Sequence, residues 1–188
     1  GNLDEARRLG RHNLDLLARG DPAVPILFLE PSCYSMFAED YRELGLAGAE
    51  TIAQRCFLFE PFIDGLLERE AQAIWFNDTP GNILIHAHCH AKALLDTSCM
   101  TRLASRLPGR KVRMLDTGCC GMAGAFGALE DKYALSLKIA EPLAEQIQHQ
   151  PFGTIVVASG TSCRQQITHL VAIRTWHMAQ LLADALQK

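Results

Sequence analysis

The sequence predicts an α/β protein: a parallel sheet with helices on both faces, and cysteines at the carboxyl ends of its strands. Two observations lead to this prediction. Short, continuous apolar runs, typical of strands buried on both faces, alternate with longer segments of helical character. Most of the cysteines follow an apolar run within a few residues, and ligands of such sheets gather at that edge.

The apolar runs and the turn residues between them place the individual elements. The first helix is typical: Asn2 can cap it, Asp4 and Glu5 lie in its first turn, and Gly20 follows its end. Pro142 is expected to bend or break the longest helix near Glu141, because proline lacks the N–H that a helix interior uses. Strands are expected at 24–29, from 83, at 112–115, 154–158 and 173–175; helices at 3–19, 33–44, 50–56, 60–74, 92–107, 129–149, after 163, and at 177–186.

Bulk composition excludes several classes of protein. The 188 residues suffice for one domain with a core or for two small lobes, and 48% hydrophobic with 21% charged residues is ordinary for a soluble protein. A formal net charge of −3 and a pI near 6.2 provide no bulk attraction to nucleic acid or anionic lipid. We therefore predict no nucleic-acid partner, and no apolar run is long enough to span a membrane.

The cysteines are the most informative residues of the chain. Their number, seven, is odd, and the chain is long for a secreted disulfide framework, so reduced cytoplasmic thiols, some of them ligands, are expected. Cys56 and Cys99 do not follow an apolar run, since both lie in helical patterns. The remaining five follow apolar runs: Cys33, Cys89, Cys119, Cys120 and Cys163.

Cys119 and Cys120 lie where an apolar run gives way to a series of glycines at 118, 121, 124 and 127. Together with Cys89 and Cys163 they supply four thiolates, enough for an iron–sulfur cluster or a cysteine-rich zinc site. The glycines let the backbone approach a bulky inorganic group and direct N–H groups at its sulfurs. Cys163 opens a helix, whose N-terminus is expected to lower the pKa of the thiol.

Three histidines flank Cys89 with the alternation of a strand: His86, His88 and His90. They could hydrogen-bond the sulfurs of a bound cluster, be ordinary polar residues at a strand end, or bind metal directly. The first of these is preferred for His88 and His90, and the same supporting role is expected of Gly121.

The chain also contains an internal repeat-like pair. Residues 26–34 and 155–164 each read as a strand, a bend, and a Ser-Cys that opens a helix, with Cys33 and Cys163 at matching positions. Cysteine-bearing segments precede the second copy but not the first. If the pair is a true repeat, the chain begins partway through its first copy.

Four segments resemble the cysteine-rich Cys-Cys-Gly (CCG) domain of iron–sulfur oxidoreductases. This family includes the cysteine-rich subunit of heterodisulfide reductase and the iron–sulfur subunits of glycolate oxidase and anaerobic glycerol-3-phosphate dehydrogenase. The chain is most similar to the C-terminal part of FAD-linked oxidases of the D-lactate and D-2-hydroxyglutarate dehydrogenase type. The matching segments are Glu30-Pro-Ser-Cys33 with Asp40-Tyr-Arg-Glu43, His88-Cys-His-Ala-Lys-Ala-Leu94, Cys119-Cys-Gly-Met-Ala-Gly124, and Gly160-Thr-Ser-Cys-Arg-Gln-Gln166.

The resemblance implies two cysteine modules in tandem. Residues 81–188 would be a complete second module, whose Cys89, Cys119, Cys120 and Cys163 hold a [4Fe–4S] cluster that purification can remove. Residues 1–80 would be the tail of a first module, with Cys33 as its last ligand, plus connecting helices. Heterodisulfide reductase ends each module in Cys-x-x-Cys, whereas here Glu30 and Gly160 replace the first cysteine, so a plain four-cysteine cluster is expected.

The function implied is electron transfer within a larger flavin-linked 2-hydroxy-acid dehydrogenase or oxidase. FAD would lie in a flavin domain or subunit of the same enzyme, and electrons would pass to a quinone or another acceptor. This fragment alone is not expected to turn over substrate. The expected location is the cytoplasm, either free or at the inner face of the membrane.

Two alternatives remain open at this stage. The first is a zinc module that uses His88, Cys89, Cys119 and Cys163. The second is a metal-free thiol domain in which Cys119 and Cys120, or Cys163, cycle through a disulfide.

Overall fold

A four-stranded parallel sheet forms the centre of the computed structural model, which describes residues 1–187. Its strand order is β4-β3-β5-β6, so the chain passes from β4 back across β3 to reach β5. This reversal creates a switch point between β3 and β5, where parallel α/β sheets bind their ligands. The strands are β3 (Gly81–Ile85), β4 (Arg110–Met114), β5 (Ile155–Val157) and β6 (Thr175–Trp176).

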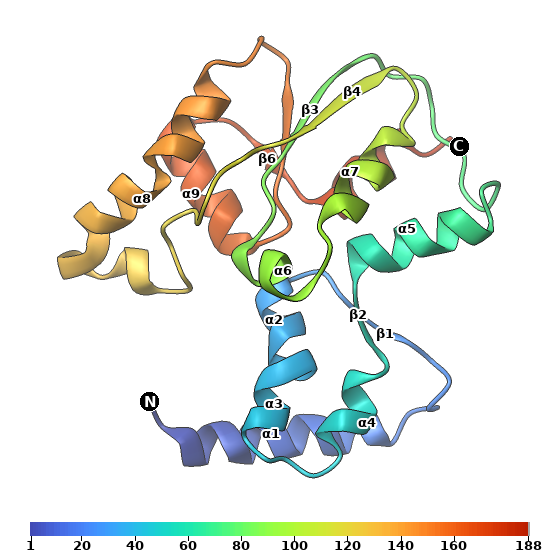
Figure 1. Ribbon diagram of the computed structural model, residues 1–188, viewed down its shortest axis with the longest axis vertical. Helices are drawn as coiled ribbons and strands as arrows, with labels where there is room; N and C mark the ends of the chain where they lie inside the picture. The colour runs from blue at the N-terminus through green and yellow to red at the C-terminus, as the bar shows by residue number, and fades with distance from the viewer. Residues whose placement is uncertain (188) are drawn as a thin grey trace.

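Helices cover both faces of this sheet (Figure 1). On one face, α8 and α9 bury an apolar cluster that includes Leu143, Ile167 and Val156. On the other, α7 and α10 bury a larger cluster around Leu103, Ile85 and others. The predicted α/β class, with helices on both faces of a parallel sheet, is confirmed. The helices are α6 (Cys89–Leu94), α7 (Ser98–Ser105), α8 (Glu130–Gln148), α9 (Thr161–Val171) and α10 (Met178–Ala185), with a 3-10 turn, η2 (Phe126–Ala128), before α8.

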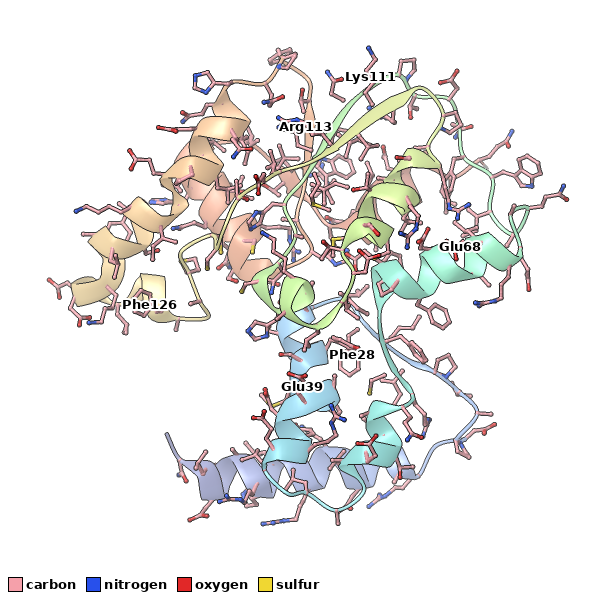
Figure 2. All side chains as sticks on the ribbon, viewed as in Figure 1. Phe28, Glu39, Glu68, Lys111, Arg113 and Phe126 are labelled. Carbon is pink, nitrogen blue, oxygen red and sulfur yellow. The ribbon has the colours of Figure 1, made fainter. Side chains whose placement is uncertain are left out.

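The N-terminal part of the chain forms a second lobe, at the bottom of Figure 1. Two parallel strands, β1 and β2, lie beside helices that bury a small core around Leu14, Tyr41 and Ile52. Figure 2 shows Phe28 of β1 in this lobe, where its ring packs against Tyr34 and Phe37. The elements are α1 (Leu3–Ala18), β1 (Ile26–Phe28), α2 (Pro31–Ser35), the π-helical η1 (Met36–Asp40), α3 (Tyr41–Glu43), α4 (Ala49–Ala53) and β2 (Cys56–Leu58).

Helix α5 (Phe59–Arg69) joins the two lobes. It follows β2 of the N-terminal lobe, yet Leu67 and Ile63 pack into the large cluster beneath the four-stranded sheet. The buried carboxylate of Asp64 also accepts hydrogen bonds from Arg102 of α7, at 2.9 Å from Nε. The lobes therefore share a core.

Several predicted elements differ from the structure. Cys56 does not lie in a helix but begins β2, because pairing with β1 in register Ile26↔Cys56 overrides the local helical pattern. The helix predicted at 92–107 is two helices, α6 and α7, separated where Asp96 accepts from the Ser98 N–H and starts the second one.

Two further predictions concern the end of one helix and the continuity of another. The helix predicted to reach residue 74 ends at Arg69. Helix α8 is not broken at Glu141: it runs through Pro142 without interruption, and its buried Leu143 and Ile147 hold it against the sheet. Within residues 1–187, no helix is long and apolar enough to cross a membrane.

Candidate functional site

Three adjacent strands bring four cysteines to one edge of the sheet. Cys89 is the first residue of α6, shortly after β3; Cys119 and Cys120 lie in the loop after β4; Cys163 lies in the first turn of α9, after β5. Because β4, β3 and β5 are parallel neighbours, their carboxyl ends lie side by side. Cys89 and Cys163 flank the switch point, so the topology alone gathers these thiols.

The four thiols are close enough to perturb one another. Contact with the Cys163 thiol is the largest cause that lowers the pKa of Cys120 to about 6. The same contact raises the pKa of Cys163, and burial and the charges of Cys120, Cys89 and Cys119 raise it further. Burial and then Cys119 raise the pKa of Cys89. Without a cation between them, these sulfurs cannot all be ionised.

This finding corrects one expectation about Cys163. We predicted that the N-terminus of α9 would lower the pKa of its thiol, and instead that pKa is raised. The side chain is 1% exposed, so desolvation and the neighbouring sulfurs outweigh the helix dipole.

The Cys-Cys-Gly loop is held by backbone geometry that only glycine satisfies easily. Gly121 has φ +86°, and a Cβ at this position would collide with the carbonyl of Ser136 in α8. Its N–H donates to Cys119 Sγ at 3.3 Å, the kind of sulfur hydrogen bond expected from the glycine series. Lys92 of α6 donates from Nζ to the carbonyls of Thr117 and Gly118, which ties the start of the loop to the helix of Cys89.

The three histidines do not share one environment. His88 is buried, and it caps α6 because its Nδ1 accepts a hydrogen bond from the His90 N–H at 3.1 Å. The same Nδ1 lies 3.9 Å from Cys89 Sγ. His90 is exposed, and its Nδ1 lies 2.6 Å from Ser35 Oγ in the N-terminal lobe. His86 is 1% exposed, with Nδ1 3.0 Å from Thr117 Oγ1, and burial lowers its pKa to about 4.

Gly160 makes room for His88. A Cβ at position 160 would collide with the imidazole ring, so any side chain there would displace the residue next to Cys89. This is the position at which heterodisulfide reductase would place an additional cysteine. The His88 ring therefore fills the space that a fifth thiol near the site would need.

The remaining cysteines lie elsewhere. Cys33 is exposed in α2, and burial and the charge of Glu30 raise the pKa of its thiol. Cys56 and Cys99 are buried within apolar clusters, and burial raises the pKa of each to about 11. The structure thus gathers Cys89, Cys119, Cys120 and Cys163 and leaves these three apart.

Sequence reasoning missed two side chains around the site. Lys92 lies three residues after Cys89, one turn along the same helix, and this spacing was the signal that could have found it. Glu30 was noted only as the residue that replaces a cysteine, whereas in the structure its carboxylate accepts from the Thr161 N–H at the start of α9.

Among residues 1–187, no group of three or more His, Cys, Asp or Glu side chains is arranged as the ligands of a single metal ion. The set His88, Cys89, Cys119 and Cys163, considered above for zinc, is therefore not gathered around one point in this part of the chain.

These features define a cysteine-rich domain with four thiols at the switch point of a parallel sheet. Residues 83–168, which contain all four, match the family model CCG, the cysteine-rich domain. The resemblance inferred from the sequence is thereby confirmed.

Longer curated proteins are similar along almost the whole chain. One subunit of the anaerobic glycerol-3-phosphate dehydrogenase of Escherichia coli K12 is 26% identical over 99% of this chain, which spans 47% of that protein. The D-2-hydroxyglutarate dehydrogenases of Pseudomonas putida and Pantoea ananatis are 26% and 27% identical over 95% and 98% of the chain, which spans 17% and 18% of their length. No solved structure matches the chain.

Proposed function

We propose that this chain is an iron–sulfur electron-transfer domain of a flavin-linked dehydrogenase. One observation carries the proposal: Cys89, Cys119, Cys120 and Cys163 meet at the switch point, and mutual contact and burial raise the pKa of two of them. Four crowded thiols of this kind are stable as thiolates only beside positive charge, which bound iron would supply.

The residues present fit a [4Fe–4S] cluster. The donor set is four cysteines, and Gly121 already donates an N–H to one sulfur. In such a cluster each cysteine binds a different iron, so the four sulfurs need not converge on one point as the ligands of a single ion do. When bound, the cluster would accept and release one electron at a time.

The surrounding residues would prepare this site for electron transfer. Buried Cys120 and Cys163 exclude water from one side, the Gly121 N–H donates to Cys119 Sγ, and His88 fixes the start of the helix of Cys89 by accepting from the His90 N–H. Lys92 holds the Cys-Cys-Gly loop against α6 and adds a positive charge beside the thiolates. Each of these contacts would favour a fixed arrangement of ligands in both oxidation states.

We further propose that residues 1–80 are the tail of a first module and residues 81–188 a complete second one, with Cys33 as a ligand of the first. The repeat-like pair supports this: β1–α2 and β2–α5 repeat the order of β5–α9 and β6–α10, and both strand pairs are parallel. β5 has a neighbour on each side, whereas within residues 1–187 β1 pairs only with β2. A strand equivalent to β3 would fit the free edge of β1.

The partners proposed follow from the relatives. Their names describe dehydrogenases, so the parent enzyme would be an oxidoreductase that acts on a 2-hydroxy acid or a similar substrate. A flavin domain or subunit with FAD would deliver electrons to this domain, and a quinone or another acceptor would receive them. The location we propose is the cytoplasm or the inner face of the membrane.

The test is anaerobic reconstitution with iron and sulfide. We expect about four irons and four sulfides for each chain, and an EPR signal on reduction. A colourless product without iron would overturn the proposal, and one equivalent of zinc in protein purified without oxygen would favour the zinc module.

A second candidate is a metal-free thiol redox domain, which the pKa of about 6 for Cys120 beside Cys163 favours. This function requires that mild oxidation join two of the four thiols and that a thiol reductant reverse it. Peptide mapping after oxidation would identify the pair, and failure to form any such disulfide would exclude this candidate.

A further inference from the structure

Glu30 binds two helix N-termini that are far apart in the sequence. Its Oε2 accepts a hydrogen bond from the Thr161 N–H at 2.7 Å, across 131 residues. Its Oε1 accepts from the Ser32 hydroxyl at 2.9 Å and from the Ser32 N–H at 3.4 Å. One carboxylate therefore joins the start of α2, which carries Cys33, to the start of α9, which carries Cys163.

Among residues 1–187, helix α9 has no other side-chain cap. Its N-cap residue is Gly160, which has no side chain to accept a hydrogen bond, and the space beside it holds the ring of His88. The first N–H groups of a helix need acceptors from elsewhere. In this protein the acceptor for Thr161 comes from the N-terminal lobe, so the helix of Cys163 depends on a residue outside its own lobe.

The bridging group carries a negative charge. Burial alone would raise the pKa of Glu30, but the hydrogen bonds from Thr161 and Ser32 outweigh it and lower the pKa below its usual value. The charge acts on the thiol of Cys33 and on His88, the neighbour of Cys89. It is thus close to ligands of both proposed modules.

We propose that Glu30 is a positioning residue that fixes the first turn of α9 and lowers the reduction potential of the group bound by Cys89, Cys119, Cys120 and Cys163. Only the effect on the reduction potential rests on the proposed function; the effect on the first turn of α9 does not. A fixed negative charge near a redox centre disfavours the added electron.

The first experiment needs no bound cluster. Amide hydrogen exchange of the first turn of α9 is compared in the wild type, Glu30→Ala and Glu43→Ala, since Glu43 is an exposed carboxylate of the same lobe. We expect exchange of the Thr161 amide to accelerate at least tenfold in Glu30→Ala and to stay at the wild-type rate in Glu43→Ala. Equal exchange in both variants would overturn the bridge.

The second experiment measures the midpoint potential of reconstituted protein by an EPR-monitored titration. Glu30→Gln removes the charge and keeps an acceptor oxygen, and Glu43→Gln is the matched control. We expect Glu30→Gln to be reduced at a more positive potential, with a change of about tenfold in the reduction equilibrium, or about 59 mV for a one-electron couple. A shift no larger than that of Glu43→Gln would overturn the electrostatic role.

The two experiments separate the inference from the proposed function. If the wild type assembles no cluster, the proposed function fails, and the exchange of the Thr161 amide still decides whether Glu30 bridges the helices. If a cluster forms and both Glu30 variants behave as their controls do, the inference fails and the proposed function stands.

Discussion

The same local design occurs twice in this chain, in different surroundings. β1 leads through Glu30-Pro-Ser to Cys33, and β5 leads through Gly160-Thr-Ser to Cys163, and each cysteine lies in the first turn of a helix. Yet Cys163 is 1% exposed among three other thiols, whereas Cys33 is exposed and isolated from them.

The difference arises from the neighbours of each strand. β5 lies between β3 and β6, so the segment after β3 and the loop beyond β4 place their cysteines around Cys163. β1 pairs within residues 1–187 only with β2, which is followed by α5 and carries no cysteine beyond its end. A Ser-Cys turn after a strand is thus not sufficient for this kind of site.

The largest expected effect distinguishes the two cysteines directly. Cys163→Ala should abolish assembly of a [4Fe–4S] cluster, because it removes one of four ligands from a buried site. Cys33→Ala should retain the wild-type amount of iron and sulfide, since Cys33 lies apart from the four thiols. Iron and sulfide for each chain after anaerobic reconstitution are the measured quantities.

The control for this pair is Cys99→Ala, a buried cysteine of the apolar cluster around α7, which tests the effect of a lost thiol on folding. It should bind the normal amount of iron. If Cys163→Ala and Cys33→Ala bind equal amounts of iron and sulfide, the surroundings of the two cysteines do not differ as the structure indicates.

The fold could be predicted from the sequence where burial dominates. The strands around Ile83 and Val156 are recognisable because both faces are covered, so they read as unbroken apolar runs. The edge strand around Val112 instead alternates, with Lys111 and Arg113 exposed. β2 was missed because its pairing with β1 depends on a partner 30 residues away and leaves Phe57 exposed.

The gathering of the four cysteines could also be predicted, because it follows from strand ends in a parallel sheet. Glu30 could not, since nothing in the local sequence shows that a carboxylate at residue 30 reaches the N–H of Thr161. The same holds for the pKa of Cys163, which depends on thiols from three other positions rather than on its own helix.

The next largest expected effect concerns the Cys-Cys-Gly loop, which has no counterpart in the N-terminal lobe. Gly121→Ala should destabilise the protein by about 3 kcal/mol or more, because a left-handed residue acquires a Cβ that collides with the backbone of Ser136. Gly124 has φ +68° but open space around it, so Gly124→Ala should lose only about 1 kcal/mol. Urea unfolding measures both.

This comparison isolates the contact from the backbone conformation. Equal losses of unfolding free energy in the two variants would show that Gly121 is needed only for its positive φ, and that the approach of the loop to α8 contributes nothing.

A smaller expected effect is the pH dependence of stability that arises from His86, which is buried just after β3. Its pKa is about 4 in the folded protein and about 6.5 when unfolded, so the unfolded state takes up the proton first as the pH falls. The stability that neutral His86 provides is complete above pH 6.5 and is lost as the pH falls towards 4, by up to roughly 3 kcal/mol.

The measurement is the unfolding free energy between pH 7.5 and 4.5, in the wild type and two variants. His86→Gln should show a shallower loss of stability on acidification, whereas His12→Gln, in the exposed first helix, should keep the wild-type slope. An unchanged slope in His86→Gln would show that other groups cause the acid loss.

The smallest effect tests the residue at which the two copies differ most, Glu30 in one and Gly160 in the other. Gly160→Ala should cost about 1–2 kcal/mol, because the new Cβ meets the ring of His88, which can move only partly in its buried position. His88→Ala alone should also destabilise the protein, since it removes the cap of α6.

In the double variant the clash disappears, so the combined loss of unfolding free energy should be smaller than the sum of the two single losses. Simple additivity in urea unfolding would mean that the two residues do not compete for the same space, and that a larger side chain at position 160 is excluded for another reason.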